Sequence, residues 1–217
     1  MAEMSAAEYA DDHGISARRV QAAAAAGSLP ARKLAGRWVI DSAAAHHDRA
    51  GRPLSIRSAH ALLTRLSGDG RWRESLSASE AARVSARLGR LQADPDPASL
   101  LASWIRSARS APMPYRVASA DLEDLRADRR LVAGGISDPR SGMSDAEELE
   151  AHVPADVLDS VVHEYLLVRS EQPNVLLHVH DGPVGRPLPL GDLIADLVQH
   201  QGPRERAAAA QLLGGIA

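Results

Sequence analysis

The chain has 217 residues, 45% of them hydrophobic and 24% charged, which is enough for one or two domains with a buried core. It contains no cysteine, which excludes a disulfide framework, a thiolate metal site and a cysteine nucleophile. No apolar run approaches the roughly 18 residues that span a bilayer, and the acidic start MAEMSAAEYADD is unlike a signal peptide, so we expect a cytoplasmic protein without a membrane partner.

The net charge of −3 conceals an asymmetry along the chain. Residues 1–130 hold 20 of the 25 Lys and Arg and 15 of the 28 Asp and Glu, a net charge of +5. Residues 131–217 have a net charge of −8. A basic front and an acidic back predict two partners of different charge, although drift in composition between two solvated surfaces is an alternative.

Residues 5–26 predict two short helices. Ser5 and Glu8 form a capping-box pattern, and Gly14 is suited to end the first helix in the left-handed conformation. Ser16 can then cap a second helix over residues 17–26, which Gly27 ends. Val20 with Ala23 or Ala24 is expected on its inner face, packed against three residues of the first helix and turn: Ala7, Ala10 and Ile15.

The outward face of the second helix carries residue types that can contact DNA bases. The N-terminal residues of a recognition helix reach base edges in the major groove. There Arg pairs with guanine, Gln pairs with adenine, and Ala touches a thymine methyl group. We expect this face to consist of Ser16, Ala17, Arg18, Arg19, Gln21 and Ala22.

A small hairpin is predicted after Pro30. Residues 31–34 and 37–40 are two short strand-like segments that flank Ala35 and Gly36. The basic residues at its tip, Arg32, Lys33 and Arg37, are suited to contact phosphates or a minor groove.

This order of elements resembles the MerR and excisionase type of winged helix-turn-helix. In that family a glycine ends the recognition helix, an apolar residue and a proline follow, and an arginine–aromatic strand closes the wing. Gly27, Leu29-Pro30 and Arg37-Trp38 stand at those places. The resemblance covers the first fifth of the chain and implies a DNA-binding domain over residues 1–50. The alternative is an alanine-rich helical hairpin with arginines facing solvent.

Three amphipathic helices are predicted between residues 55 and 108. Ser55 caps the first, a second capping box of Ser77 and Glu80 begins the next, and a turn over residues 94–97 precedes the third. Apolar residues at helical spacing mark their inner faces: Ile56, Ala59, Leu62, Leu63 and Leu66, then Ala81, Val84, Leu88 and Leu91, then Leu100, Leu101, Trp104, Ile105 and Ala108. We interpret residues 51–115 as a helical region that carries the DNA-binding domain or provides a homodimer interface.

Residues 116–217 predict a small α+β domain. The expected strands cover residues 115–117, 131–133, 164–168 and 175–180, and the last two pair across the polar loop 170–174. The expected helices cover residues 121–128, the acidic stretch 144–151, residues 190–198, and a last segment that begins at Pro203. The predicted fold class is mainly α, with a small α+β C-terminal domain and an N-terminal winged helix-turn-helix.

Short motifs along the chain resemble actinobacterial helix-turn-helix antitoxins of the AbiEi type. They are Gly51-Arg52-Pro53-Leu54-Ser55 with Arg57-Ser58-Ala59, Pro173-Asn174-Val175-Leu176-Leu177, Asp196-Leu197 and Pro203-Arg204-Glu205. The resemblance implies an N-terminal DNA-binding domain and a larger C-terminal domain. It also implies repression of the protein's own operon and opposition to a toxin encoded beside it, with or without direct contact.

Sequence motifs for catalysis or metal binding are sparse. His178 and His180 point to one side of a predicted strand and could share a metal if His152, His163 or Asp181 supplied a third ligand. We interpret the pair as a half-buried strand face and predict no metal site, no cofactor and no catalytic residue. Gly134-Gly135 follows a predicted strand, but neither a Walker nor a dinucleotide-binding glycine motif surrounds it.

These patterns favour a sequence-specific DNA-binding regulator, the antitoxin and autorepressor of a toxin–antitoxin operon. Its expected partners are double-stranded DNA of its own operator, a cognate toxin at the acidic C-terminal region, and a second copy of the chain. Three alternatives stay open. One is an excisionase-like protein that bends DNA, another is an enzyme that acts on nucleic acid, and the third is an interaction module whose acidic tail binds a basic partner.

Overall fold

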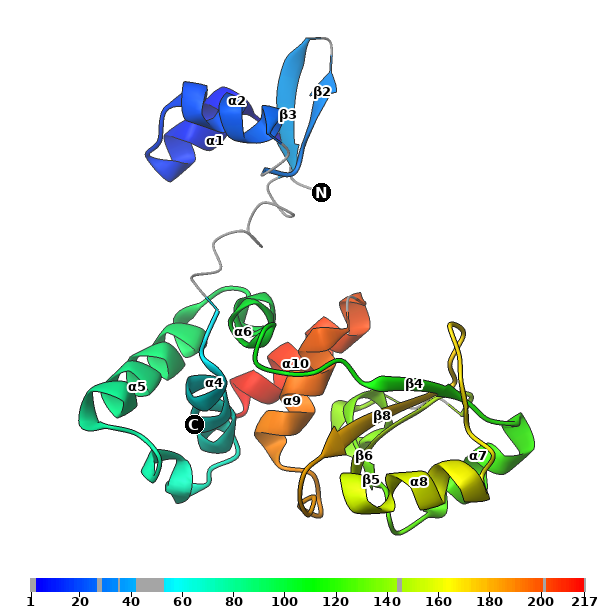
Figure 1. Ribbon diagram of the computed structural model, residues 1–217. Coiled ribbons are helices and arrows are strands. Elements are labelled where there is room, and N and C mark those ends of the chain that lie inside the picture. Colours follow the sequence, from blue (N-terminus) through cyan, green and yellow to red (C-terminus); the bar gives the residue numbers. More distant parts are fainter. Residues whose placement is uncertain are drawn as a thin grey trace. The chain divides into compact units, whose positions relative to one another are not determined.

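The chain divides into two units, Met1–Gly51 and Arg52–Ala217, in the computed structural model (Figure 1). The structure describes residues 3–26, 29–34, 36–41, 53–143, 146–200 and 202–216. Within these ranges, no helix combines the length and the apolar character that crossing a bilayer requires. We call the two parts the N-terminal unit and the C-terminal unit.

The N-terminal unit consists of two helices and an antiparallel sheet in the order β1-β3-β2. Its elements are β1 (Glu3–Ser5), α1 (Ala6–His13), α2 (Ala17–Ala25), β2 (Ala31–Leu34) and β3 (Arg37–Asp41). Both helices contact β3, and the core between them contains Ala6, Tyr9, Ala10, Val20, Leu29 and Ile40.

The predicted helix caps of this unit are confirmed. The Ser5 N–H donates to Glu8 Oε2 at 2.8 Å, and the Glu8 N–H donates to Ser5 Oγ at 3.2 Å. Gly14 ends α1 with a φ of 62°, and Ser16 Oγ accepts the Arg19 N–H at 3.4 Å. Gly27 and Ala35, which the prediction also used, lie outside the described residues.

Part of the predicted inner face is wrong. Ala7 and Ile15 are exposed. The reason is the rotation of α1 about its axis, which turns Ala6, Tyr9 and Ala10 toward the core at spacings of three and four residues. Strand β1, which pairs with β3, was not predicted.

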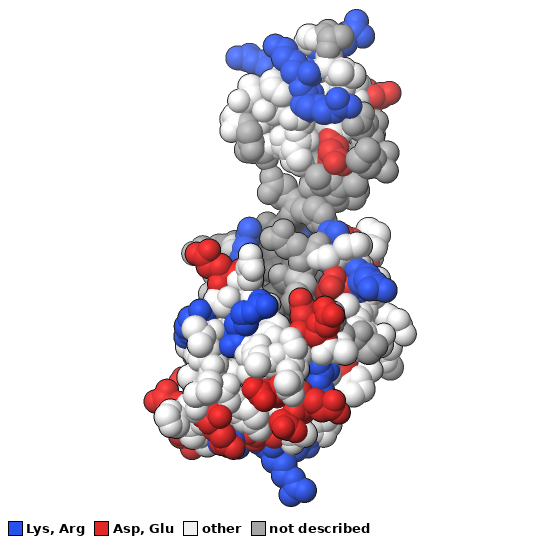
Figure 2. Space-filling view, turned by 90° about the vertical axis from the view of Figure 1, so that its right-hand side faces the viewer, with Lys and Arg blue, Asp and Glu red and all other residues white. Residues whose placement is uncertain are grey.

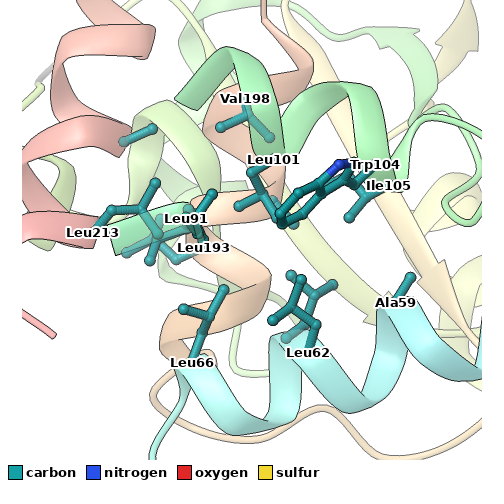
Figure 3. Packing of buried hydrophobic residues seen from close by; sticks show 14 of the residues in the cluster. Ala59, Leu62, Leu66, Leu91, Leu101, Trp104, Ile105, Leu193, Val198 and Leu213 are labelled. Atoms are coloured by element: carbon teal, nitrogen blue, oxygen red, sulfur yellow. The ribbon is translucent and has the colours of Figure 1, made fainter. Parts of the chain in front are cut away.

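Five helices surround one apolar core in the C-terminal unit. They are α4 (Ile56–Leu66), α5 (Ala78–Ala93), α6 (Pro97–Ile105), α9 (Leu190–Gln199) and α10 (Pro203–Gly214), in contact along α4–α9, α6–α9 and α9–α10. Figure 3 shows Leu62 and Leu66 of α4 pointing into the same core as Leu101 of α6 and Leu193 of α9. Helices from both ends of this unit therefore share one core. The predicted helices over 55–66, 77–91 and 190–198 are confirmed.

A five-stranded mixed sheet forms the other half of the C-terminal unit. Its order is β5-β6-β8-β4-β7, and β6 and β8 are parallel whereas the other pairs are antiparallel. The strands are β4 (Met113–Arg116), β5 (Val132–Ala133), β6 (Leu149–Pro154), β7 (Val168–Arg169) and β8 (Val175–His180). Helices α7 (Leu122–Ala127) and α8 (Ala155–Glu164) cover one face of this sheet. The C-terminal unit also contains short 3₁₀ helices: η2 (Gly70–Arg73), η3 (Ser119–Asp121), η4 (Gly135–Ser137) and η5 (Pro139–Ser141).

The two faces of β6 and β8 differ in chemistry. Successive side chains of a strand alternate between faces. The apolar face contains Leu149, Ala151 and Val153 of β6 with Val175 and Leu177 of β8, packed against α7 and α8. The opposite face carries Glu150, His152, His178 and His180. His152 and His178 lie beside Asp196 of α9, and Glu150 accepts the Ile136 N–H of η4.

The predicted fold class, mainly α with a small α+β domain, is wrong. Helix accounts for about 53% and strand for about 16% of the structure, with one sheet of three strands and one of five, so the fold is mixed α/β. The acidic stretch 144–151 was expected to be a helix, but residues 149–154 form β6 because both of its faces are buried. The expected hairpin of 164–168 with 175–180 is also wrong, since β7 pairs with β4.

Candidate functional site

Most of the predicted DNA-binding residues of α2 are exposed at its N-terminal half. Arg18, Arg19 and Gln21 project from the helix, and Ser16 caps it. Ala17 is the exception, because it is half buried against the core of the N-terminal unit. The exposed face of α2 is therefore narrower than predicted.

The β2–β3 hairpin presents its basic residues on two faces. The register pairs Arg32 with Val39, Lys33 with Trp38 and Leu34 with Arg37. Since directly opposite residues share a face, Arg32 and Arg37 lie together on one face. Lys33 lies on the other face, with its Nζ 5.9 Å from the centre of the Trp38 ring.

The basic side chains of the N-terminal unit form an exposed group. Figure 2 shows Lys and Arg gathered over this unit. Within the part of it that the structure describes, every Lys and Arg is exposed: Arg18, Arg19, Arg32, Lys33 and Arg37. Exposed Lys and Arg side chains are the residue types that can contact phosphates.

A second cluster of functional groups lies buried in the C-terminal unit. His152 of β6 and His178 of β8 are Cα partners on adjacent parallel strands. Their rings stack with centroids 4.6 Å apart and an interplanar angle of 13°. The two residues are 0% and 5% exposed.

Asp196 of α9 joins the two histidines to an arginine. Its Oδ2 lies 2.7 Å from His152 Nε2, and its Oδ1 lies 3.7 Å from His178 Nε2. Arg109, which follows α6, donates through Nη2 to Asp196 Oδ1 at 2.6 Å and through Nη1 to Asp192 Oδ1 at 3.0 Å. The fully buried Asp196 thus has both a cation and an imidazole beside it.

Glu150 is the second buried carboxylate. It lies 2.8 Å from the Nε2 atoms of both His178 and His200 and accepts the Ile136 N–H at 3.0 Å. Burial alone would raise the pKa of Glu150, but its hydrogen bonds with His178 and His200 outweigh burial and hold that pKa well below its usual range. The same hydrogen bond to Glu150 raises the pKa of His200.

His180 links the cluster to the surface. Its Nε2 lies 2.6 Å from His152 Nδ1, so an imidazole–imidazole–carboxylate chain runs from His180 through His152 to Asp196. Burial and the neighbouring His152 lower the pKa of His180. A cavity of about 260 Å³, lined in part by His60, Arg109, His178, His180 and Asp192, reaches this edge of the cluster.

The Gly134-Gly135 turn packs directly on the cluster. The Gly135 N–H donates to Asp196 Oδ2 at 3.3 Å. A Cβ added at Gly135 would lie 1.7 Å from Glu150 Oε2, and one at Gly134 would lie 2.6 Å from His152 Cδ2. Only glycine fits at these two positions, because the backbone lies so close to the buried side chains of the cluster. This packing explains the Gly134-Gly135 pair without a phosphate ligand.

The sequence identified only part of this cluster. His178 and His180 share one face as their spacing indicates, and of the three possible third ligands it is His152 that lies beside them, while His163 and Asp181 are exposed. Arg109, Glu150, Asp196 and His200 were missed. The alternation of apolar and polar residues over 149–153 was the available signal for Glu150 and His152.

Chemically, the cluster combines the donors of a metal site with those of a proton relay. One ligand atom from each of His152, His178 and Asp196 lies within 4.8 Å of the others. Two imidazoles and a carboxylate are a donor set that zinc and related ions accept.

Comparison with protein-family models, with curated proteins and with solved structures finds no match to this chain.

Proposed function

We propose that the protein is a sequence-specific DNA-binding transcriptional regulator that acts in the cytoplasm. The N-terminal unit would be its winged helix-turn-helix, with α2 in the major groove and the β2–β3 hairpin as the wing. The observation that carries this proposal is the joint exposure of Arg18, Arg19 and Gln21 on α2 and of Arg32 and Arg37 on one face of the hairpin. Helix side chains of these types match base edges, and hairpin arginines match phosphates.

The test is DNA binding by the full chain to the region upstream of its own reading frame. Fluorescence anisotropy at several salt concentrations would compare this DNA with scrambled DNA. Replacing Arg18 and Arg19 by Ala should reduce the preference for the upstream region by at least tenfold, since each good bidentate base contact discriminates by about 1–3 kcal/mol. The matched control is Arg106→Ala with Arg129→Ala, two exposed arginines of the C-terminal unit. Equal preference in the wild type and the α2 variant would rule out α2 as the recognition helix.

We further propose that this regulator is the antitoxin and autorepressor of a toxin–antitoxin operon. The support is the likeness of its short motifs to antitoxins of the AbiEi type and the net charge of −8 over residues 131–217, which suits a basic partner. Co-expression with the adjacent reading frame tests the proposal. Rescue of growth with co-purification indicates a bound toxin, rescue without it indicates indirect antagonism, and no rescue contradicts the antitoxin assignment.

An architectural role in recombination predicts a different result on the same DNA. An excisionase-like protein would bend its site, whereas a simple repressor need not. Circular-permutation gel shifts on the bound fragment separate the two functions.

A further inference from the structure

We propose that His152, His178 and Asp196 bind one divalent transition-metal ion of the zinc class inside the C-terminal unit. The site is independent of the proposed DNA binding, since every residue that forms it lies between residues 109 and 200. It also departs from the expectation, drawn from the sequence, that the chain has no metal site.

The first argument is the convergence of three elements on one point. His152, His178 and Asp196 come from β6, β8 and α9, and each is at most 5% exposed. Tetrahedral zinc with bonds of about 2.0–2.2 Å places its ligand atoms about 3.3–3.6 Å apart. Asp196 Oδ2 lies 2.7 Å from His152 Nε2 and Asp196 Oδ1 lies 3.7 Å from His178 Nε2, and one ligand atom of each residue lies within 4.8 Å of the others. Side-chain rotations would bring the two nitrogens and one Asp196 oxygen to the zinc spacing.

The second argument is that the candidate ligands are held by a further layer of hydrogen bonds. Arg109 and the Gly135 N–H hold the Asp196 carboxylate, and His180 lies against His152 Nδ1. Metal-binding residues are typically fixed in this way, because the outer contacts set ring orientation and tautomer. His152 and Asp196 are therefore organised before any ion arrives, whereas His178 Nε2 exchanges its hydrogen bond with Glu150 for the ion.

The third argument is charge. Glu150, Asp192 and Asp196 bring three carboxylates to the cluster, and Arg109 bonds two of them. With the imidazoles of His152 and His178 neutral, as coordination requires, Arg109 and His200 are the groups beside these carboxylates that can balance their charge. A divalent cation would supply further positive charge next to Asp196.

Access and donor type decide the kind of ion. The cavity of about 260 Å³ lined by Arg109, His178, His180 and Asp192 provides a route from solvent. Imidazole nitrogens favour zinc and its transition-metal neighbours over Mg²⁺ and Ca²⁺, which prefer oxygen ligands.

The test uses the full chain, purified without a polyhistidine tag. Elemental analysis should find one zinc-class ion per chain. After chelation and dialysis, titration with Zn²⁺ against a chromophoric chelator should restore one site, and Co²⁺ should give the visible absorption of a low-coordinate nitrogen–oxygen site. Zinc at a hundredfold excess over its Kd should raise the Tm of the chelated wild type by about 5–10 °C.

Variants locate the site. His152→Gln, His178→Gln and Asp196→Asn should each weaken zinc binding at least a hundredfold, whereas His163→Gln, an exposed histidine on α8, should not. Circular dichroism identifies any variant that fails to fold. If a variant does not fold, the Co²⁺ spectrum and the zinc-dependent Tm shift of the wild type test the proposal in its place. Binding that survives all three ligand variants would overturn the proposal. A chelated wild type with no measurable affinity for Zn²⁺ would overturn it as well.

Discussion

His152 and His178 occupy the same level of two adjacent parallel strands, and their rings stack 4.6 Å apart with Asp196 of α9 beside both. Parallel pairing places the carboxyl ends of β6 and β8 at one edge of the sheet, so His180 and the end of β6 reach the same edge. A polar face is thereby buried between the sheet and α9. Burying these polar side chains costs desolvation free energy, which their hydrogen bonds and ion pairs must offset.

Arg109→Gln should be among the most destabilising single substitutions in the cluster. It removes the cation that bonds the fully buried Asp196, and breaking a buried pair in this way costs about 3–5 kcal/mol. Urea unfolding in the presence of a chelator measures the change without a contribution from bound metal.

The matched control for Arg109 is Arg71→Gln. Arg71 pairs with Asp69 at 2.8 Å on the surface, with 76% of its side chain exposed, so its loss should change the unfolding free energy far less than the loss of Arg109. Similar losses for the two variants would show that the Arg109–Asp196 pair contributes no more than an ordinary surface pair.

Gly135→Ala should destabilise the C-terminal unit by several kcal/mol. Gly135 has a φ of 44°, and the added Cβ would overlap a Glu150 oxygen, so strain and displacement of a buried carboxylate add together. Gly142→Ala is the control, because Gly142 has a φ of 68° but open space around it and should lose only about 1 kcal/mol from backbone strain. Thermal unfolding that ranks the two variants equally would contradict the close approach.

Arg37→Ala should weaken binding to all DNA sequences by a similar factor. If Arg37 neutralises one phosphate, the slope of log K against log salt should become shallower by about 0.9. Arg106→Ala provides the comparison, and its slope should match that of the wild type. A loss confined to the upstream DNA, with an unchanged slope, would instead assign Arg37 to a base contact.

The ion pair of Asp128 and Arg130 should make part of the stability dependent on pH. Hydrogen bonds from the Arg130 guanidinium, with Nε 3.1 and 3.0 Å from the two carboxylate oxygens, hold the pKa of Asp128 below its usual range. Because the folded pKa lies below the unfolded value of about 3.9, the charged form stabilises the fold above about pH 4, and that contribution is lost as the pH falls through the folded pKa.

Asp128→Asn should therefore be less stable than the wild type at pH 6, and the difference should shrink at pH 3. Urea unfolding at the two pH values measures it, and Arg130→Gln should show the same narrowing because it removes the donor. A constant difference at both pH values would mean that the carboxyl has the same pKa in the folded and unfolded states.

The helices of this protein could be predicted from the sequence because their signals are local. Ser5, Ser16 and Ser77 each cap a helix as their positions indicate, and the apolar spacing of α4 and α9 marks their buried faces. These signals need no knowledge of the rest of the chain.

The sheet and the buried cluster were less predictable because they depend on distant segments. Residues 144–151 are acidic and favour a helix locally, but burial on both faces imposes the strand β6 from residue 149 onward. Once residues 144–151 are taken as helix, no strand places His152 beside His178, and nothing in the local pattern directs Asp196 toward either. The parallel pairing of β6 with β8 brings His152 and His178 together. Parallel strands are joined by a long crossover connection, so no short turn motif in the sequence indicates this pairing.

The contrast between the two faces of β8 also fixes how that strand can align. A shift by a single residue would turn His178 and His180 into the apolar layer beneath α7 and α8 and would bring Leu177 against Asp196. Both changes would leave unpaired polar groups away from water, which is unfavourable. The buried histidines thus help to specify the register of β8 in the sheet, whether or not a metal ion is bound.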